Sequence, residues 1–152
     1  MLKPEHVLYD QKFNPMALKQ PTPKVGVGVV LRNAENKILL GVRKGSHGAG
    51  EWSIPGGHME IGETFFQTCR REVLEETGIA ILGVKDIGFA NNIFEKEGLH
   101  YVTLFFEAIW DQSQEAENCE PDRTERWEWF LKKNLPDDLF GAIKEAVSKG
   151  II

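Results

Sequence analysis

The sequence has few cysteines and no long apolar run, and each absence excludes a class of protein. Cys69 and Cys119 are the only cysteines among its 152 residues. Two are too few for a disulfide framework, and this is typical of a reducing compartment. No apolar stretch approaches the ~18 residues of a membrane-spanning helix, and residues 1–6 contain no apolar core of a secretory signal. We therefore expect a cytoplasmic protein with no membrane partner.

Basic residues are also fewer than acidic ones. The chain carries 18 Lys and Arg against 23 Asp and Glu, a net charge of −5. An acidic protein repels the phosphate backbone, which argues against a nucleic acid polymer as partner. A small polyphosphate would be repelled as well, unless a cation lay between it and the protein.

The domain organisation follows from the distribution of proline and apolar residues. Residues 1–23 show little periodicity and contain four prolines, which break any long element. We predict an N-terminal extension over 1–23 and one domain over 24–152, a length that suits a single core.

The apolar pattern of the domain predicts an α+β fold, a mixed β-sheet sandwiched between α-helices. The expected strands are 25–31 and 37–43, which form a hairpin, and 52–54, 84–94, 101–110 and 127–130. We expect Pro55 to Gly57 to end the third strand. The expected helices are 64–77 and 137–149. Thr64 and Gln67 form a capping box and Gly78 ends the first helix, which Val73 and Leu74 anchor to the core.

This first helix carries three glutamates on one face. Glu72, Glu75 and Glu76 are spaced i, i+3, i+4, and like charges at this spacing destabilise a helix by ~0.2–0.5 kcal/mol per pair. Arg70 and Arg71 precede them, and the spacing points these two elsewhere around the helix. Such a cluster is usually a solvated surface. The alternative is a divalent cation among the carboxylates, where oxygen ligands favour Mg²⁺, Mn²⁺ or Ca²⁺.

Residues around the cluster decide between these two interpretations. Together they read Gly-x5-Glu-x7-Arg-Glu-apolar-x-Glu-Glu-x-Gly-apolar. The defined positions are Gly57, Glu63, Arg71, Glu72, Val73, Glu75, Glu76, Gly78 and Ile79. The chain resembles the Nudix hydrolase family, whose complete signature this is, placed as expected on a glycine-rich loop and a capped helix.

The resemblance implies the Nudix fold and a set of site residues. Glu72, Glu75, Glu76 and the carbonyl of Gly57 would bind Mg²⁺, with Mn²⁺ as a substitute. Glu72 or a nearby carboxylate would activate the attacking water. Glu63 would contact the metal ligands without binding the metal itself, and Arg71 would orient the glutamates by ion pairing. The catalytic residues we predict are thus Glu72, Glu63 and Arg71.

Four further segments are similar to the MutT-like branch, the nucleoside triphosphate pyrophosphatases of the nucleotide pool. They are 41–46, 55–58, 100–103 and 127–129. This similarity implies hydrolysis of a nucleoside triphosphate to the monophosphate and pyrophosphate. Arg43 and Lys44 are candidates for phosphate contacts, with surface solubility as the alternative. Glu125 is a candidate for an extra carboxylate, in competition with Glu120 and Asp122.

The base pocket is less well defined by the sequence. Thr103, Phe140, Leu139 and Asn91 are its candidate residues, and the alternative is that Phe140 and Leu139 belong to the core. Relatives often carry tryptophan after the matching phenylalanine, where this chain has Gly141. Specificity for an oxidised guanine therefore does not follow.

Two other functions stay open. One is a Nudix hydrolase of ADP-ribose, dinucleoside polyphosphates or nucleotide sugars. Ile93 and Glu95 stand where the first two branches usually carry proline and tyrosine. The other is a non-catalytic nucleotide-binding module, which usually loses signature glutamates that this chain retains. Relatives are commonly dimers, so a homodimer is the assembly to test.

Overall fold

The computed structural model describes residues 21–45 and 47–152 and contains two sheets and two α-helices. Most of the expected N-terminal extension, residues 1–20, and Ser46 lie outside the described residues. The elements are β1 (Lys24–Val30), β2 (Ile38–Arg43), β3 (Trp52–Ser53), β4 (Gly56–His58), α1 (Phe65–Thr77), β5 (Ile81–Phe94), β6 (Leu99–Trp110), β7 (Thr124–Phe130), the 3-10 helix η3 (Lys132–Asn134) and α2 (Gly141–Ser148).

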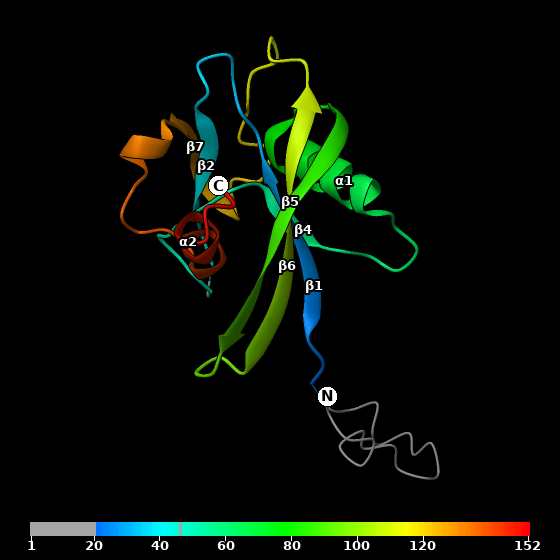
Figure 1. Ribbon diagram of the computed structural model, residues 1–152, viewed down its shortest axis with the longest axis vertical. Helices are drawn as coiled ribbons and strands as arrows, with labels where there is room; N and C mark the ends of the chain where they lie inside the picture. Colours follow the sequence, from blue (N-terminus) through cyan, green and yellow to red (C-terminus); the bar gives the residue numbers. More distant parts are fainter. Residues whose placement is uncertain (1–20, 46) are drawn as a thin grey trace.

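The larger sheet has the order β4-β1-β6-β5, and the smaller one has the order β3-β2-β7. β1 runs parallel to β6 and antiparallel to β4, so the predicted mixed sheet is confirmed. Figure 1 shows β5 and β6 as a long hairpin that passes between the helices, with α1 on one side and α2 with the smaller sheet on the other. This is the predicted α/β/α arrangement.

The predicted hairpin between the first two strands is wrong. β1 and β2 lie in different sheets, and the one isolated bridge near them joins Ile38 to Arg32, which lies after the end of β1. β1 has no free edge for β2, because β4 and β6 already pair with its two edges. The turn itself was located correctly: the Asn33 side chain accepts hydrogen bonds from the backbone of Glu35 and Lys37, and Asn36 has a φ of 59°.

β3 ends at Ser53, before Pro55, as predicted, but a further strand follows at once that was not predicted. Gly56 to His58 form β4, which pairs with β1. A Cβ atom on Gly56 would lie 2.1 Å from the carbonyl oxygen of Val27, so only glycine allows this approach. Gly56 is therefore required for the close backbone contact between β4 and β1.

The two helices agree with the prediction to different degrees. The Thr64–Gln67 capping box is present, and Gly78 ends α1 with a left-handed φ of 73°. Val73 is fully buried, as predicted, but Leu74 is 46% exposed and does not anchor the helix. The second helix begins at residue 141 and not at 137, because the backbone N–H of Phe140 donates to the carbonyl of Trp52 in β3.

Candidate active site

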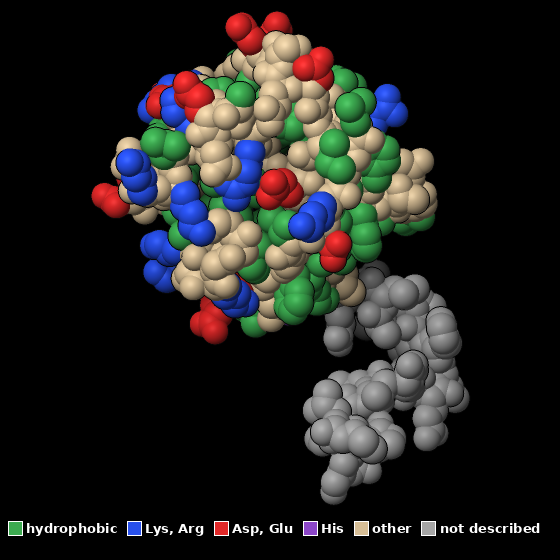
Figure 2. All heavy atoms as spheres, turned by 45° about the horizontal axis from the view of Figure 1, so that its top comes forward, with side chains coloured by type: hydrophobic (Ala, Val, Ile, Leu, Met, Phe, Trp, Pro, Cys, Tyr) green, Lys and Arg blue, Asp and Glu red, His purple; other side chains and the backbone are tan. Residues whose placement is uncertain are grey.

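A cavity of about 590 Å³ lies between the α2-facing side of the larger sheet and the carboxylate face of α1. Gly26 and Gly28 of β1 contribute no side chain to its floor. Its charged residues include Arg43, Glu60, Arg71, Glu72, Glu75, Glu76, Glu120 and Arg123, and its aromatic ones are His47, His58, Phe94, Tyr101 and Phe140. Acidic and basic side chains also lie close together on the face of the molecule shown in Figure 2.

The acidic residue Glu72 and the aromatic residue Tyr101 lie beside different positions along β1. Gly57, which touches Glu72, pairs with Val27, whereas Tyr101 pairs with Lys24. Three residues of strand separate these positions, which is ~10 Å at ~3.3 Å per residue. The cavity therefore has a carboxylate end and an aromatic end.

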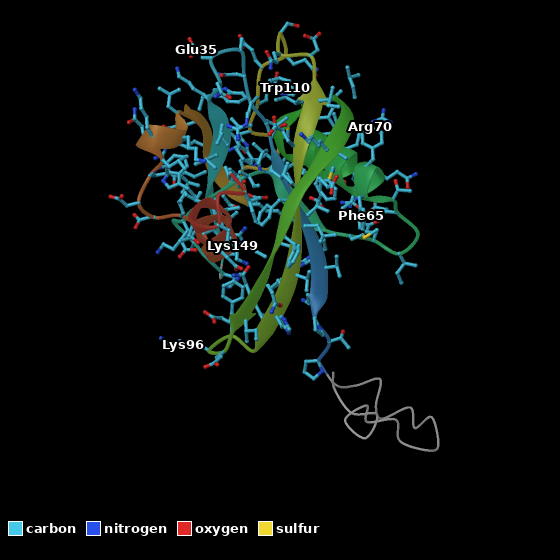
Figure 3. All side chains as sticks on the ribbon, in the orientation of Figure 1. Glu35, Phe65, Arg70, Lys96, Trp110 and Lys149 are labelled. Carbon is cyan, nitrogen blue, oxygen red and sulfur yellow. The ribbon has the colours of Figure 1, made fainter. Side chains whose placement is uncertain are left out.

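Arg71 organises the carboxylate end. Its Nε and Nη2 atoms donate to the two carboxylate oxygens of Glu63 at 2.7 and 2.9 Å, and its Nη1 donates to Glu72 at 2.8 Å. Nη1 also lies 3.6 Å from the carboxylate of Glu75. The expectation that Arg71 points away from the glutamates is thus wrong, because its long side chain reaches back along α1. Arg70 does lie on the outer side of α1 (Figure 3).

Glu72 is the buried member of the acidic cluster, and Glu76 is partly buried. Glu72 is 7% exposed, and a Cβ on Gly57 would lie 2.4 Å from its carboxyl carbon. Burial raises the pKa of Glu72 against the opposing effect of Arg71. Burial, with a further contribution from the charge of Glu72, raises the pKa of Glu76 well above its ordinary value. The Glu76 carboxylate accepts a long hydrogen bond, 3.4 Å, from the backbone N–H of Gly56.

These observations bear on whether the cluster suits a metal ion. Arg71 bonds Glu63 and Glu72, and no described cation lies within ion-pair distance of Glu76, so the cluster is short of positive charge, and a divalent cation would supply it. Residues 21–45 and 47–152 hold no three acidic, His or Cys side chains already gathered around one point. The Glu72 carboxylate is hydrogen-bonded to Arg71, and the Glu76 carboxylate to the backbone N–H of Gly56. Both carboxylates would therefore have to reorient to bind a metal ion. The donors are all oxygen, the set that Mg²⁺ and Mn²⁺ prefer.

The structure places the predicted substrate residues unevenly. Arg43 and Thr103 line the cavity, whereas Lys44 donates to the carbonyl of Pro121 at 2.8 Å. Burial lowers the pKa of Arg43. Its guanidinium carbon lies 4.1 Å from the ring centroid of Phe140. Phe140 is thus part of the cavity wall and not only of the core.

The other predicted substrate residues, which are Glu125, Leu139 and Asn91, do not line the cavity. Glu125 pairs with Arg126, and its competitor Glu120 lines the cavity instead. Leu139 packs in the core. The Oδ1 atom of Asn91 accepts a hydrogen bond from Nε2 of His100.

The cavity residues that were not predicted from the sequence include His47, Asn92, Phe94 and Tyr101. Asn92 and Tyr101 are paired across β5 and β6. Strand alternation puts Asn92 and Phe94 on one face and Asn91 on the other. The alternation of these residues is visible in the sequence, but the strand register is needed to know which face of β5 lines the cavity.

The comparison with family models decides the family. Residues 22–149 match the model described as the NUDIX domain. The chain belongs to the Nudix family. An oxidized purine nucleoside triphosphate hydrolase of Danio rerio is 34% identical over 108 residues, which are 71% of this chain and 67% of that protein.

Solved structures agree. A MutT Nudix hydrolase of Burkholderia pseudomallei has a TM-score of 0.78 and 33% identity, covering 84% of this chain and 98% of that one. A MutT protein of Methanosarcina mazei has a TM-score of 0.75 over 86% and 94% of the two chains, and at 20% identity it shows the fold alone. The protein is a Nudix hydrolase with the Nudix fold. In the described residues, no helix of this Nudix hydrolase is both long and apolar enough to span a membrane.

Proposed function

We propose that this Nudix hydrolase is a Mg²⁺-dependent pyrophosphohydrolase that converts a nucleoside triphosphate to the monophosphate and pyrophosphate. The observation that carries the proposal is the pair of Glu72, which is buried, and Glu76, which is partly buried, at one end of a cavity whose other end is aromatic. A cation among the carboxylates would hold the phosphates, and the aromatic rings offer faces on which a base stacks.

Glu72, Glu75, Glu76 and the carbonyl of Gly57 would hold the cation. The cation would supply Lewis acidity, which makes water a better nucleophile and offsets charge on the phosphoryl oxygens. In this proposal Glu72 would accept the proton of the attacking water. The water oxygen forms a bond to phosphorus, the anhydride P–O bond breaks, and the pyrophosphate leaves with the bonding electron pair.

Arg71 and Glu63 position this machinery without touching the substrate. Arg71 holds Glu72 at 2.8 Å, and Glu63 fixes two of the remaining guanidinium N–H groups. Arg43 reaches the cavity between the two ends, where its charge would bind phosphate. Preorganised donors of this kind stabilise developing charge without rearranging during the reaction.

The similarity to an oxidized purine nucleoside triphosphate hydrolase supports a triphosphate substrate and a purine base. Hydrolysis of ADP-ribose, a dinucleoside polyphosphate or a nucleotide sugar is the alternative within the same fold. We also propose that the enzyme works in the cytoplasm. The mass in solution, measured by light scattering, tests the homodimer that the resemblance implies.

The test is a release assay for pyrophosphate and phosphate across canonical and oxidised triphosphates, ADP-ribose, dinucleoside polyphosphates and nucleotide sugars, each with Mg²⁺ and with EDTA. We expect pyrophosphate release from a triphosphate that EDTA abolishes and Mn²⁺ partly restores. Turnover of only the other compounds would overturn the substrate. A folded protein that turns over none of them would instead be a binding module.

A further inference from the structure

The aromatic end of the cavity contains polar atoms without partners. Asn92 Oδ1 and His47 Nε2 are buried, and neither forms a hydrogen bond with any of the described residues. Both residues line the cavity. A buried polar group without a hydrogen bond costs ~1–3 kcal/mol. The missing bond can be supplied by a group that enters the cavity.

The orientation of the Asn92 amide is fixed by chemistry. Its Nδ2 donates to Oε2 of Glu145 in α2 at 2.8 Å. The other oxygen of Glu145 pairs with Lys149, and this contact holds the pKa of Glu145 below its ordinary value. An ionised carboxylate only accepts hydrogen bonds. The NH₂ group must therefore face Glu145, which leaves Oδ1, an acceptor, on the other side.

The space beside Asn92 is shaped for a flat ring. The imidazole of His47 lines the same cavity, with its centroid 4.5 Å from that of Phe94, 5.4 Å from Phe140 and 6.4 Å from the nearly parallel ring of Tyr101. Gly45, Gly48 and Gly50 lie close to His47 in the sequence and have positive φ, a conformation that glycine adopts without strain. An entering base would take the place of the imidazole.

We propose that Asn92, oriented by Glu145, selects a purine by accepting a hydrogen bond from its exocyclic amino group. Glu145 is a positioning residue: it does not touch the base but determines that the pocket presents an acceptor. The proposal deepens the proposed function, on which it rests for the nucleotide substrate. A site built to bond an N–H group discriminates strongly against the analogue that lacks it, because the acceptor then stays unpaired.

Binding titrations of matched monophosphates test this without any turnover. GMP and IMP differ by the 2-amino group, and AMP and purine riboside monophosphate differ by the 6-amino group. We expect the full chain to bind the amino-bearing member of one pair at least ~10-fold more tightly. Asn92→Leu should bring the two affinities together. Equal affinities within both pairs in the unmodified protein, or discrimination that survives in Asn92→Leu, would overturn the proposal.

Replacing the Glu145 carboxylate by an amide of nearly the same shape tests whether the orientation of the Asn92 amide determines the preference. In Glu145→Gln the new amide can donate to Asn92 Oδ1, which turns the Asn92 NH₂ group toward the pocket, so the preference should vanish or reverse. The double variant Asn92→Asp, Glu145→Gln restores an acceptor in the pocket and should restore the preference. Lys149→Met, which leaves the Asn92–Glu145 bond in place, is the matched control. A preference unchanged in Glu145→Gln would contradict the positioning role.

The two proposals fail in distinguishable ways. If the release assay detects no triphosphate hydrolysis while the monophosphate pairs are discriminated through Asn92, the base site stands and the proposed activity falls. If hydrolysis occurs but Asn92→Leu leaves the discrimination within both pairs unchanged, the activity stands and the assignment of Asn92 falls.

Discussion

The guanidinium of Arg71 holds the carboxylate of Glu63 in a two-point contact, with 2.7 Å between Nε and Oε1 and 2.9 Å between Nη2 and Oε2. Glu63 lies in the loop before α1, and its Oε2 also accepts from the backbone of Glu60 and the hydroxyl of Thr68. The pair therefore ties the loop to the helix that carries the acidic cluster. Planar, two-point contacts of this kind fix orientation as well as charge.

Stability should depend on pH through Glu63. Its hydrogen bond from Arg71 lowers the pKa of Glu63 from 4.5 to about 2. Because the folded pKa lies below the unfolded one, the stabilisation is fully present above about pH 4.5 and is lost as pH falls through about 2. We expect Glu63→Gln to lower the melting temperature at about pH 7 and to have little effect on it at about pH 2. Thermal melts of both proteins across this range measure it.

The control for this measurement is Glu95→Gln, in the exposed turn between β5 and β6. It should leave the melting temperature unchanged at every pH. A Glu63→Gln defect of equal size at both ends of the range would show that the loss is one of packing and not of the ion pair.

Arg71→Lys should reduce activity although it keeps the charge. An ammonium group cannot bond both oxygens of Glu63 and also Glu72 in the planar geometry of the guanidinium. Losing a group that orients metal ligands typically costs ~10- to 100-fold in metal affinity or activity, and we expect kcat/KM to fall by that factor. Arg70→Lys, one residue away on the outer side of α1, is the matched control (Figure 3). Equal activities of the two variants would remove Arg71 from the positioning role.

The sequence predicted the acidic cluster better than its surroundings, for a physical reason. A helix fixes the relative positions of Glu72 and Glu76 through local geometry alone. The loop contact of Glu63 and the strand residue Asn92 depend instead on long-range packing and register. A shift of one residue in register separates Asn91, which was chosen from the sequence, from Asn92, which lines the cavity.

The error in strand pairing has the same origin. Two apolar strands joined by a short turn favour a hairpin, but β1 is an interior strand whose edges are both occupied. Nothing local distinguishes an interior strand from one arm of a hairpin. The glycines of β4 carried the missing information, because Gly56 permits a backbone contact that no other residue could make.

Glu76→Gln should lower turnover by at least ~10²-fold without unfolding the protein, because it removes a proposed metal ligand that acts in the transition state. The amide is nearly isosteric and neutral, and the carboxylate it replaces is penalised by burial. The melting temperature without metal should therefore not fall, while the rise that Mg²⁺ produces should shrink. Turnover close to that of the unmodified protein would refute the assignment. Glu95→Gln again serves as the control.

Gly57→Ala should disable the carboxylate end by sterics alone. The added Cβ would lie 2.4 to 2.5 Å from the carboxyl carbon and oxygens of Glu72, so Glu72 would have to leave its buried position beside Arg71. We expect a loss of activity comparable to that of Glu76→Gln. Gly83→Ala in β5 is the matched control, because its Cβ would meet Ile109 at an ordinary 3.5 Å. Activity assays and thermal melts of both variants separate the two effects: if Gly57→Ala retained activity equal to Gly83→Ala, the placement of Glu72 against this backbone would have no catalytic importance.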